Sequence, residues 1–267
     1  GWQRLRIWGM GIASTDLNGD RFPDYYLTSM ADQKLQVLKD VPKEGAPKPQ
    51  YADIAWPAGV TAHRPYTGDD LKPSTGWHAQ FEDVNNDGFA DLFVAKGNVW
   101  SMPDFSMKDP NNLLLQTLEM KFVEAGDKAG VSSFAQSRGG AVVDLNLDGL
   151  VDLVVVNRNE PSQVWRNASE GAGGYIAVEL RQNGPNRDAV GAFVEVRTGG
   201  RFQQREITVG GGHASGQLAP WHFGVGSASK ADVRVHWPDG NTGNWLTVNA
   251  GAIYRIRPEV EPELLQH

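Results

Sequence analysis

One acidic pattern occurs three times in this chain: aspartate, asparagine and aspartate at alternate positions, followed four residues later by another aspartate. The three copies are Asp16, Asn18, Asp20, Asp24; Asp83, Asn85, Asp87, Asp91; and Asp144, Asn146, Asp148, Asp152. Alternate residues of a tightly curved loop can direct their side chains at one point, and Ca²⁺ takes roughly six to eight oxygen ligands. The spacing therefore predicts up to three calcium loops, in which positions 1, 3, 5 and 9 supply side-chain oxygens.

Two other positions of the pattern fit the same chemistry. Position 7 is apolar in each copy (Phe22, Phe89 and Leu150), so it can offer the ion only a backbone carbonyl while its side chain packs inward. Position 6 is Gly88 or Gly149 in the second and third copies, which suits the positive φ of a sharp loop. The first copy has Arg21 there, and we expect it to bind calcium less well.

The residues that follow each loop predict a strand. An EF-hand continues to a glutamate at position 12 on a helix, whereas position 12 is here Leu27, Val94 or Val155. Each of these lies in a run of β-branched, aromatic and other apolar residues that is typical of a strand. Each loop is therefore expected to connect two strands of a hairpin. The alternative for a single copy is a solvated acidic turn, which three copies in one register disfavour.

Composition limits the classes of partner. The chain has 267 residues, enough for one large domain or two ordinary ones, and a net charge of −7. Nine of its 32 acidic residues are the loop aspartates, so the acidity is local to the predicted metal sites. No basic patch with interleaved aromatic residues is present, which argues against a nucleic-acid partner.

The predicted metal and the absence of cysteine bear on location. The chain has no cysteine, which excludes disulfides and thiolate sites. Calcium loops of moderate affinity fill where free Ca²⁺ is about millimolar, so a secreted, extracellular or periplasmic location is expected. No apolar run is long enough for a transmembrane segment. Because the sequence starts at Gly1 without an initiator methionine, we expect a processed or partial product, from which an upstream signal or anchor would be missing.

Similarity between the copies extends beyond the loops. The loop starts are 67 and 61 residues apart, and a glycine-containing strand precedes each one, at residues 8–13, 76–81 and 138–143. A third apolar run follows each strand pair, at residues 35–38, 112–115 and 163–166, and a fourth follows in the first two copies, at 51–54 and 121–124. Four short strands in a period of about 60 residues are typical of a β-propeller blade.

These features resemble the FG-GAP or VCBS repeats of integrin-like propellers, in which calcium ties the first two strands of a blade together. The resemblance predicts a partial, three-blade propeller over residues 1–167. A propeller ring has at least about four blades, so missing blades or a protein partner are expected to complete it. The third copy also lacks a fourth strand in the sequence pattern.

A different strand-rich region follows. Alternating segments at residues 175–180, 189–198, 201–209, 231–237, 245–248 and 252–256 predict a small antiparallel β-sandwich or barrel over 168–257, followed by a tail at 258–267. Residues 186–192, 210–217 and 222–240 resemble the ASPIC/UnbV domain, which follows FG-GAP repeats in the cartilage acidic protein-like family and in many bacterial exported proteins. The order of the two resemblances matches that family.

Other chemical signals are weaker. The run from Gly210 to Gly212 lacks the ending of a phosphate-binding loop and is expected to be a plain turn. None of the six histidines has metal-ligand spacing in the sequence. The strongest hint of acid/base chemistry is His63 with Asp69 and Asp70 in a long loop, for which a solvated loop face is the favoured interpretation. Three tryptophans near loop and proline signals are expected at a partner surface: Trp56, Trp100 and Trp221.

Together the patterns favour an exported calcium-binding β-propeller protein that acts as a non-enzymatic scaffold, adhesion or accessory subunit of a larger complex, without catalytic residues. Calcium would be structural, because each ion neutralises three aspartates that repel one another. The alternatives are a metal-dependent carbohydrate-active lyase or hydratase, and a glycan-binding module, which would make a glycan a further partner.

Overall fold

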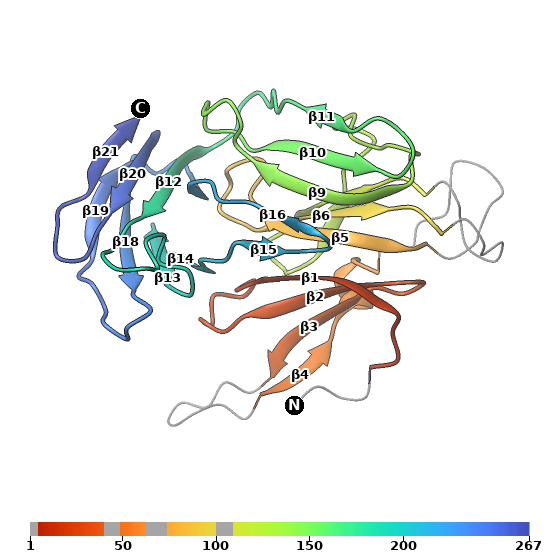
Figure 1. The fold of residues 1–267 in the computed structure, drawn as a ribbon, viewed down its shortest axis with the longest axis horizontal. Coiled ribbons are helices and arrows are strands. Elements are labelled where there is room, and N and C mark those ends of the chain that lie inside the picture. The colour runs from red at the N-terminus through yellow and green to blue at the C-terminus, as the bar shows by residue number, and fades with distance from the viewer. Residues whose placement is uncertain (1–4, 40–48, 62–73, 100–108, 267) are drawn as a thin grey trace.

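The computed structural model describes residues 5–39, 49–61, 74–99 and 109–266. It confirms an all-β protein: 49% of the chain is strand, and the one helix in the described part is the single turn α1 (Ala55–Ala58). The sheets form a propeller-like arrangement (Figure 1).

The first three sheets correspond to the three sequence repeats, and we call them blades 1, 2 and 3. Blade 1 comprises β1 (Gly9–Thr15), β2 (Asp24–Ser29), β3 (Lys34–Lys39) and β4 (Gln50–Asp53); blade 2 comprises β5 (Gly76–Glu82), β6 (Asp91–Lys96), β7 (Asn112–Gln116) and β8 (Phe122–Glu124); blade 3 comprises β9 (Ser137–Val143), β10 (Asp152–Asn157) and β11 (Gln163–Trp165). All neighbours within a blade are antiparallel. Within the described residues blade 3 has three strands, as its sequence pattern indicates.

The C-terminal region forms two four-stranded sheets. In spatial order, one contains β17 (Trp221–Gly226), β12 (Gly174–Leu180), β20 (Ala252–Ile256) and β21 (Glu263–Gln266); the other contains β14 (Arg201–Glu206), β13 (Phe193–Thr198), β18 (Lys230–His236) and β19 (Leu246–Asn249). Buried side chains from both sheets, such as Ile176 and Val233, belong to one hydrophobic core. We call this pair of sheets the sandwich.

Three details correct the sequence-based expectation. The described residues form five sheets of three or four strands in the propeller-like ring, where the repeats predicted three blades. The sandwich is not purely antiparallel, because β12 and β20 pair in parallel with Ile176 opposite Ala252. The predicted tail at 258–267 contains β21, which pairs with β20.

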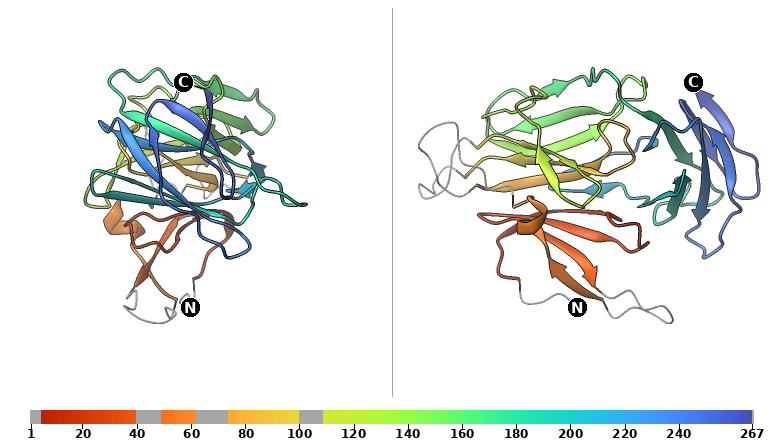
Figure 2. Two further views of the ribbon diagram at one scale, coloured as in Figure 1. Left: turned by 90° about the vertical axis from the view of Figure 1, so that its left-hand side faces the viewer. Right: turned by 180° about the vertical axis from the view of Figure 1, so that it is seen from behind.

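The first strands of the blades lie side by side at the centre, with β5 between β1 and β9 (Figures 1 and 2). The hydroxyl of Thr28 donates to the carbonyl of Trp77 (2.6 Å) and so links blade 1 to blade 2. The side chain of Gln80 in β5 both accepts from the amide of Val142 in β9 (3.0 Å) and donates to its carbonyl (2.8 Å). These bonds tie β5 to β2 of blade 1 on one side and to β9 of blade 3 on the other.

A ribbon from the sandwich lies across these inner strands. This axial ribbon, residues 209–217, contains β15 (Gly210–Gly211) and β16 (Ser215–Gly216). Gly212 and Ile12 of β1 exchange backbone hydrogen bonds (2.9 and 3.2 Å), and the hydroxyl of Ser215 accepts from the amide of Gly140 in β9 (3.2 Å). The backbone of Gly212 comes so close to β5 that a Cβ there would lie 2.2 Å from Nδ1 of His78. The glycine run therefore allows a close approach at the turn, and no phosphate loop forms.

A buried ion pair also joins the sandwich to blade 2. Arg205 of β14 lies 2.5 Å from the carboxylate of Glu82 at the end of β5, and both side chains are at least 93% buried. Burial raises the pKa of Glu82, and the charge of Arg205 opposes that rise. Glu82 thus depends on a cation that comes from the other part of the chain.

We predict that Arg205→Met lowers the free energy of unfolding by about 3–5 kcal/mol, because it leaves the Glu82 carboxylate buried without its partner. The double variant Glu82→Gln/Arg205→Met should recover much of the loss, as measured by urea unfolding. Lys121→Met, which removes an exposed pair with Glu119, is the control and should change stability by less than about 1 kcal/mol. An Arg205→Met protein as stable as the wild type would contradict this account.

Candidate metal centres

Each acidic loop connects the first two strands of a blade, as predicted. Loop 1 (residues 16–24) joins β1 to β2, loop 2 (83–91) joins β5 to β6, and loop 3 (144–152) joins β9 to β10. Position 9 is the first residue of the second strand in every case. The loops are therefore corners of hairpins, and no helix follows any of them.

The three loops share one hydrogen-bond framework. The carboxylate at position 1 accepts the backbone amides of positions 5 and 6; for Asp83 the donors are Asp87 (3.0 Å) and Gly88 (2.6 Å). The carboxylate at position 5 accepts the amide of position 7 and the side-chain NH₂ of the asparagine at position 3. Loops 1 and 3 repeat all four bonds. The nine-residue pattern thus specifies one loop conformation.

The aspartate at position 9 ties the loop to the rest of its blade. One oxygen of Asp91 accepts the amide of Val84 at position 2 (3.0 Å), and the other accepts the amide of Gln116 at the end of β7 (2.9 Å). Asp24 and Asp152 make the equivalent pairs of bonds to Leu17 and Leu38, and to Leu145 and Asn167. Each carboxylate oxygen has a second lone pair, so these bonds leave acceptor capacity for a cation.

Each loop has positive φ at two positions. Position 6 has positive φ in all three, at Arg21 (70°), Gly88 (85°) and Gly149 (86°), as the sequence predicted for a sharp loop. Position 4 also has positive φ, at Gly19 (75°), Asn86 (60°) and Leu147 (61°). Every loop therefore holds one non-glycine residue in the left-handed region. This conformation costs more free energy for a leucine such as Leu147 than for an asparagine. The strain at Arg21 in loop 1 has a counterpart in loop 3.

The loops also differ in how deeply their carboxylates are buried, and burial raises the pKa of a carboxylate. It raises the pKa of Asp83 to about 7 and that of Asp91 to about 8 in loop 2, and the charges of neighbouring loop aspartates add to the rise. In loop 1 burial raises the pKa of Asp16 to about 6 and that of Asp24 to about 7. Loop 3 is more open, with Asn146 and Asp148 exposed. Loops 1 and 2 thus hold carboxylates where negative charge is unfavourable unless a cation lies beside it.

The donor set fits a hard cation when its neutral oxygens are counted. Within the described residues, no three acidic, histidine or cysteine side chains form a group that could by itself hold a metal. Each loop adds the side-chain oxygen of its asparagine and the carbonyl of position 7, both of which are oxygen ligands of the kind that Ca²⁺ uses. The side chains of Phe22, Phe89 and Leu150 are half-buried. A site here requires both carboxylate and neutral oxygens.

Loop 2 also contacts loop 3 and the sandwich through Asn86. Its NH₂ group donates to the carbonyl of Gly149 in loop 3 (2.9 Å) and to that of Gly173 before β12 (3.1 Å). Its oxygen lies 2.6 Å from Nε2 of the buried His222 in β17. Burial lowers the pKa of His222 to about 3, so the imidazole is neutral and its Nε2–H donates to Asn86. Gly224 lies so close that a Cβ would meet Oδ2 of Asp83.

The hairpin β13–β14 of the sandwich reaches loops 1 and 2. The guanidinium of Arg201 lies 3.6 Å from the ring centroid of Phe89, at position 7 of loop 2, and donates to the carbonyl of Asp87. A second cation–π contact has the cation on the loop and the ring on the hairpin: the guanidinium of Arg21 in loop 1 lies 4.6 Å from the ring centroid of Phe202. A cleft of about 630 Å³ lies between the hairpin and the two loops. Arg21, which was expected only to weaken its loop, contributes a contact between domains.

Sequence reasoning located the loops but not the contacts on them. Asn86 and His222 lie 136 residues apart, and neither follows a spacing rule that points to the other. Trp56 is 83% exposed, as expected for a partner surface, whereas Trp221 is half-buried and lines a cavity between the inner strands and the axial ribbon. Trp100 and the acid/base candidates His63, Asp69 and Asp70 lie outside the described residues. No observation on the described residues favours the lyase alternative.

One family model matches the chain. Residues 182–263 match the family described as ASPIC and UnbV, which confirms that resemblance for the C-terminal region. The match covers β13 to β20 and leaves out β12, one of the two inner strands of a sandwich sheet. No curated protein matches the sequence. The relationship of the blades to FG-GAP or VCBS repeats stays a prediction.

We predict that Leu147→Gly stabilises the protein by about 0.5–1 kcal/mol, because glycine adopts the left-handed conformation at position 4 without strain. Leu145→Gly in the same loop is the matched control; Leu145 is also exposed but does not have positive φ, so its replacement should destabilise. Thermal unfolding of the two variants measures the difference. Equal losses of stability would show that Leu147 is not strained.

Asn86→Gly should have the opposite effect at the same position of loop 2. Glycine keeps the left-handed backbone but removes the bonds to two carbonyls and leaves the Nε2–H of His222 buried without a partner. We expect a loss of about 2–4 kcal/mol, measured by urea unfolding. A variant as stable as the wild type would mean that the Asn86 contacts do not hold the sandwich on the blades.

Proposed function

We propose that this chain is an exported calcium-binding β-propeller protein, with blades of the FG-GAP or VCBS type, that acts as a non-enzymatic scaffold or interaction subunit. The propeller-like fold and the ASPIC/UnbV region fit a scaffold or protein-interaction role. The observation that carries the calcium proposal is the repetition of one loop conformation at three blade corners, with oxygen donors at the same positions each time.

Loop 2 is the strongest of the three proposed sites. Asp83, Asn85, Asp87 and Asp91 would hold the ion with the carbonyl of Phe89, and glycine at position 6 leaves that turn unstrained. Bound calcium would supply positive charge to carboxylates whose ionisation burial opposes. It would not take part in a reaction; its proposed role is to hold the corner between β5 and β6.

The contacts between loop 2 and the sandwich give the proposed calcium a second role, which is to hold the sandwich against the blades. Arg201 and His222 contact the backbone of Asp87 and the side chain of Asn86, both of which belong to loop 2. A loop whose carboxylates repel one another holds these groups less firmly than a loop closed around a cation. Calcium at loop 2 would therefore stabilise the contact between blades and sandwich as well as the blade.

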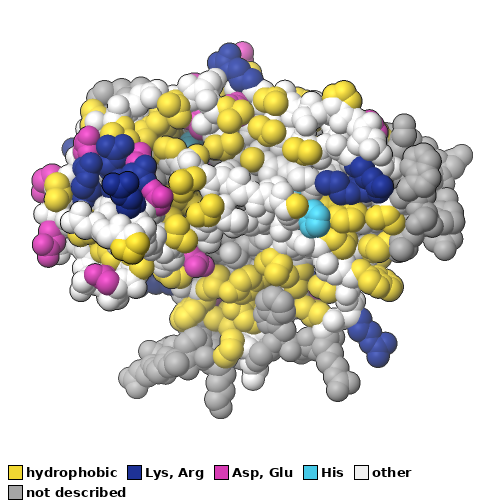
Figure 3. All heavy atoms as spheres, viewed as in Figure 1, with side chains coloured by type: hydrophobic (Ala, Val, Ile, Leu, Met, Phe, Trp, Pro, Cys, Tyr) yellow, Lys and Arg dark blue, Asp and Glu magenta, His cyan; other side chains and the backbone are white. Residues whose placement is uncertain are grey.

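The surface of blade 1 supports an interaction role. Trp8, just before β1, and Trp56 of α1 are 70% and 83% exposed. Figure 3 shows apolar side chains gathered over the part of the surface that blade 1 occupies. Such clustering of exposed apolar side chains is common where a protein meets a partner. In the described part of the chain, no helix has the length and apolar character needed to cross a membrane.

Calcium removal tests the proposal. EDTA should lower the melting temperature by about 5–10 °C, since a ligand at a hundred times its Kd contributes about 2.7 kcal/mol. Restoring Ca²⁺ should reverse the shift, whereas Mg²⁺ at the same concentration should do so poorly. Asp83→Asn/Asp87→Asn should remove the part of the calcium-dependent shift that comes from loop 2 and leave the parts from loops 1 and 3. An unchanged melting temperature and no calcium by elemental analysis would refute the proposal.

A further inference from the structure

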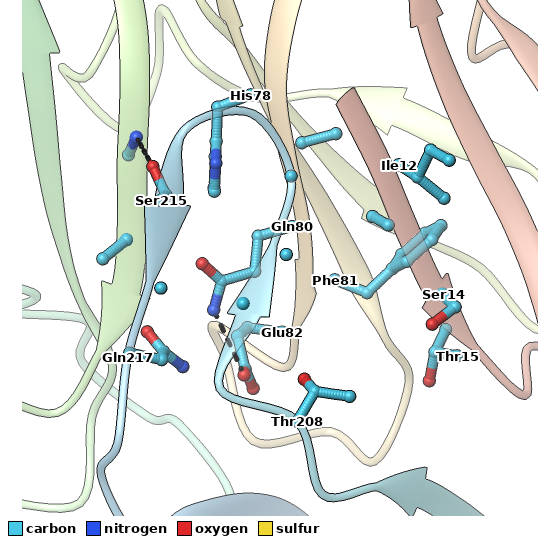
Figure 4. A pocket seen from close by; sticks show the side chains of 18 of the residues that line it. Ile12, Ser14, Thr15, His78, Gln80, Phe81, Glu82, Thr208, Ser215 and Gln217 are labelled. Carbon is cyan, nitrogen blue, oxygen red and sulfur yellow. Dashed lines mark hydrogen bonds between the residues drawn. The ribbon is translucent and has the colours of Figure 1, made fainter. Parts of the chain in front are cut away.

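Two hollows of the molecule differ in what they offer a ligand. In the central cavity, between the inner strands and the axial ribbon, polar side chains bond within the chain. Gln80 donates to Glu82 (3.4 Å), and Ser215 accepts from the amide of Gly140, as the dashed lines in Figure 4 show. A groove of about 500 Å³ on the sandwich, which we call the arginine groove, is different. Four of its six lining residues are arginines: Arg181, Arg187, Arg255 and Arg257.

The parallel pairing of β12 with β20 gathers these arginines. The two strands end opposite each other, so Arg181 and Arg257, which follow them directly, leave the sheet at the same edge. The amide of Arg181 donates to the carbonyl of Ile256 (3.0 Å). The amide of Gln182 donates to the carbonyl of Arg187 (2.9 Å), which folds the next turn back toward the groove. Figure 3 shows basic side chains, flanked by acidic ones, over the part of the sandwich where β12 and β20 lie in Figure 1.

The guanidinium groups of the groove outnumber the carboxylates beside them. Arg187 is exposed and makes no ion pair with any described residue. Four guanidinium groups and three carboxylates leave one positive charge in excess. The other arginines pair with these carboxylates as follows: Glu179 with Arg181 (2.7 Å) and Arg255 (3.2 Å), Glu263 with Arg257 (2.6 Å) and Arg255 (3.5 Å), and Asp188 with Arg181.

The residues next to Arg187 have structural roles that its own side chain lacks. The side chain of Asn186 bonds to the amide and the carbonyl of Val190 (3.0 and 2.9 Å), and Ala189 is buried in the sandwich core. All of them belong to the segment 186–192, within the ASPIC and UnbV match. The guanidinium of Arg187 therefore keeps its N–H donors for a ligand, in the planar arrangement that can hold a carboxylate with two parallel bonds.

The charges around the groove favour one carboxylate over a polyanion. Glu179, Asp188 and Glu263 flank the arginines, and they would repel the further negative charges of a nucleic acid or a sulfated polysaccharide. A single carboxylate matches the single excess positive charge. Arginine also suits this ligand, because its guanidinium fits the geometry of a carboxylate.

An apolar pocket of about 120 Å³ continues the groove. It shares Arg181 and Asp188 with the groove, and Leu218, Pro220 and Trp221 form part of its wall. Leu218 is 59% exposed, so apolar surface of this wall is in contact with water. A cavity of about 150 Å³ holds benzene, and a slightly smaller hollow therefore suits a branched aliphatic side chain.

We propose that the arginine groove and this pocket bind a peptide segment of a partner protein in which a carboxylate lies beside a branched aliphatic side chain, such as that of leucine. The carboxylate bonds to Arg187 and to the nitrogens of Arg257 that do not bond to Glu263. The aliphatic side chain covers Leu218 and Trp221 and removes their apolar surface from water. This inference rests on the proposed interaction role of the chain and gives that role a surface and a ligand chemistry.

NMR titration of the calcium-saturated full chain tests the proposal. N-acetyl-leucine, which has a carboxylate and an aliphatic side chain on one residue, should shift the Nε–H resonances of the groove arginines in a saturable manner. N-acetyl-leucinamide, which lacks the charge, and N-acetylglycine, which lacks the side chain, should bind at least tenfold more weakly. N-acetyl-glutamyl-leucinamide identifies the source of the carboxylate, because it binds only if a side-chain carboxylate can replace a chain end.

Two variants separate the parts of the site. Arg187→Gln should weaken binding of N-acetyl-leucine at least tenfold, since it removes the guanidinium that makes no ion pair. Arg158→Gln, at another exposed arginine that lies outside the groove, is the matched control and should leave the affinity unchanged. Leu218→Ser should weaken binding of N-acetyl-leucine but not that of N-acetylglycine. Circular dichroism confirms that the variants fold.

Three results would overturn the proposal. One is the absence of a saturable shift with both N-acetyl-leucine and N-acetyl-glutamyl-leucinamide. Another is equal affinity in Arg187→Gln and in the wild type. The third is tighter binding of glucuronate or inorganic phosphate than of N-acetyl-leucine, which would assign the groove to a glycan or a phosphate group. None of these results bears on the calcium proposal, because every sample contains saturating Ca²⁺ and no residue of the three acidic loops lines the groove.

Discussion

Buried negative charge at the corners of the blades is the constraint on which the rest of this structure depends. Loop 2 brings Asp83 and Asp91 into surroundings that disfavour their ionised forms. The same loop contacts loop 3 through Asn86 and the sandwich through His222 and Arg201. Whatever balances the loop carboxylates therefore also sets how firmly the blades and the sandwich hold together. Calcium is the proposed counter-charge.

The sandwich contributes to the centre of the propeller-like arrangement as well as to its edge. Its axial ribbon bonds to β1 at Ile12 and to β9 at Gly140, across the strand β5 that lies between them. Arg205 meanwhile supplies the cation that Glu82 needs. The sequence alone implied that three repeats were too few to form a ring. Part of the expected completion comes from the same chain, whose last two sheets join the first three.

The local features were predictable from sequence because each depends on residues close together in the chain. The spacing of the loop aspartates fixes the hairpin corners, and strand periodicity fixes β1 to β3 and their repeats. The parallel pairing of β12 with β20, the strand β21 and the contact of Asn86 with His222 were not predicted. Each joins segments that local patterns do not relate. The positive φ of Leu147 was missed because leucine gives no signal for that conformation.

The central claim is that loop 2 closes around calcium and thereby supports the sandwich. A crystal structure of the calcium-loaded protein, with anomalous scattering measured at a wavelength where calcium contributes, tests it most directly. The account predicts an anomalous peak in loop 2, with oxygens of Asp83, Asn85, Asp87, Asp91 and the Phe89 carbonyl about 2.3–2.6 Å away. Loop 2 without an anomalous peak at millimolar calcium, with its carboxylates bonded only to water and backbone amides, would contradict it.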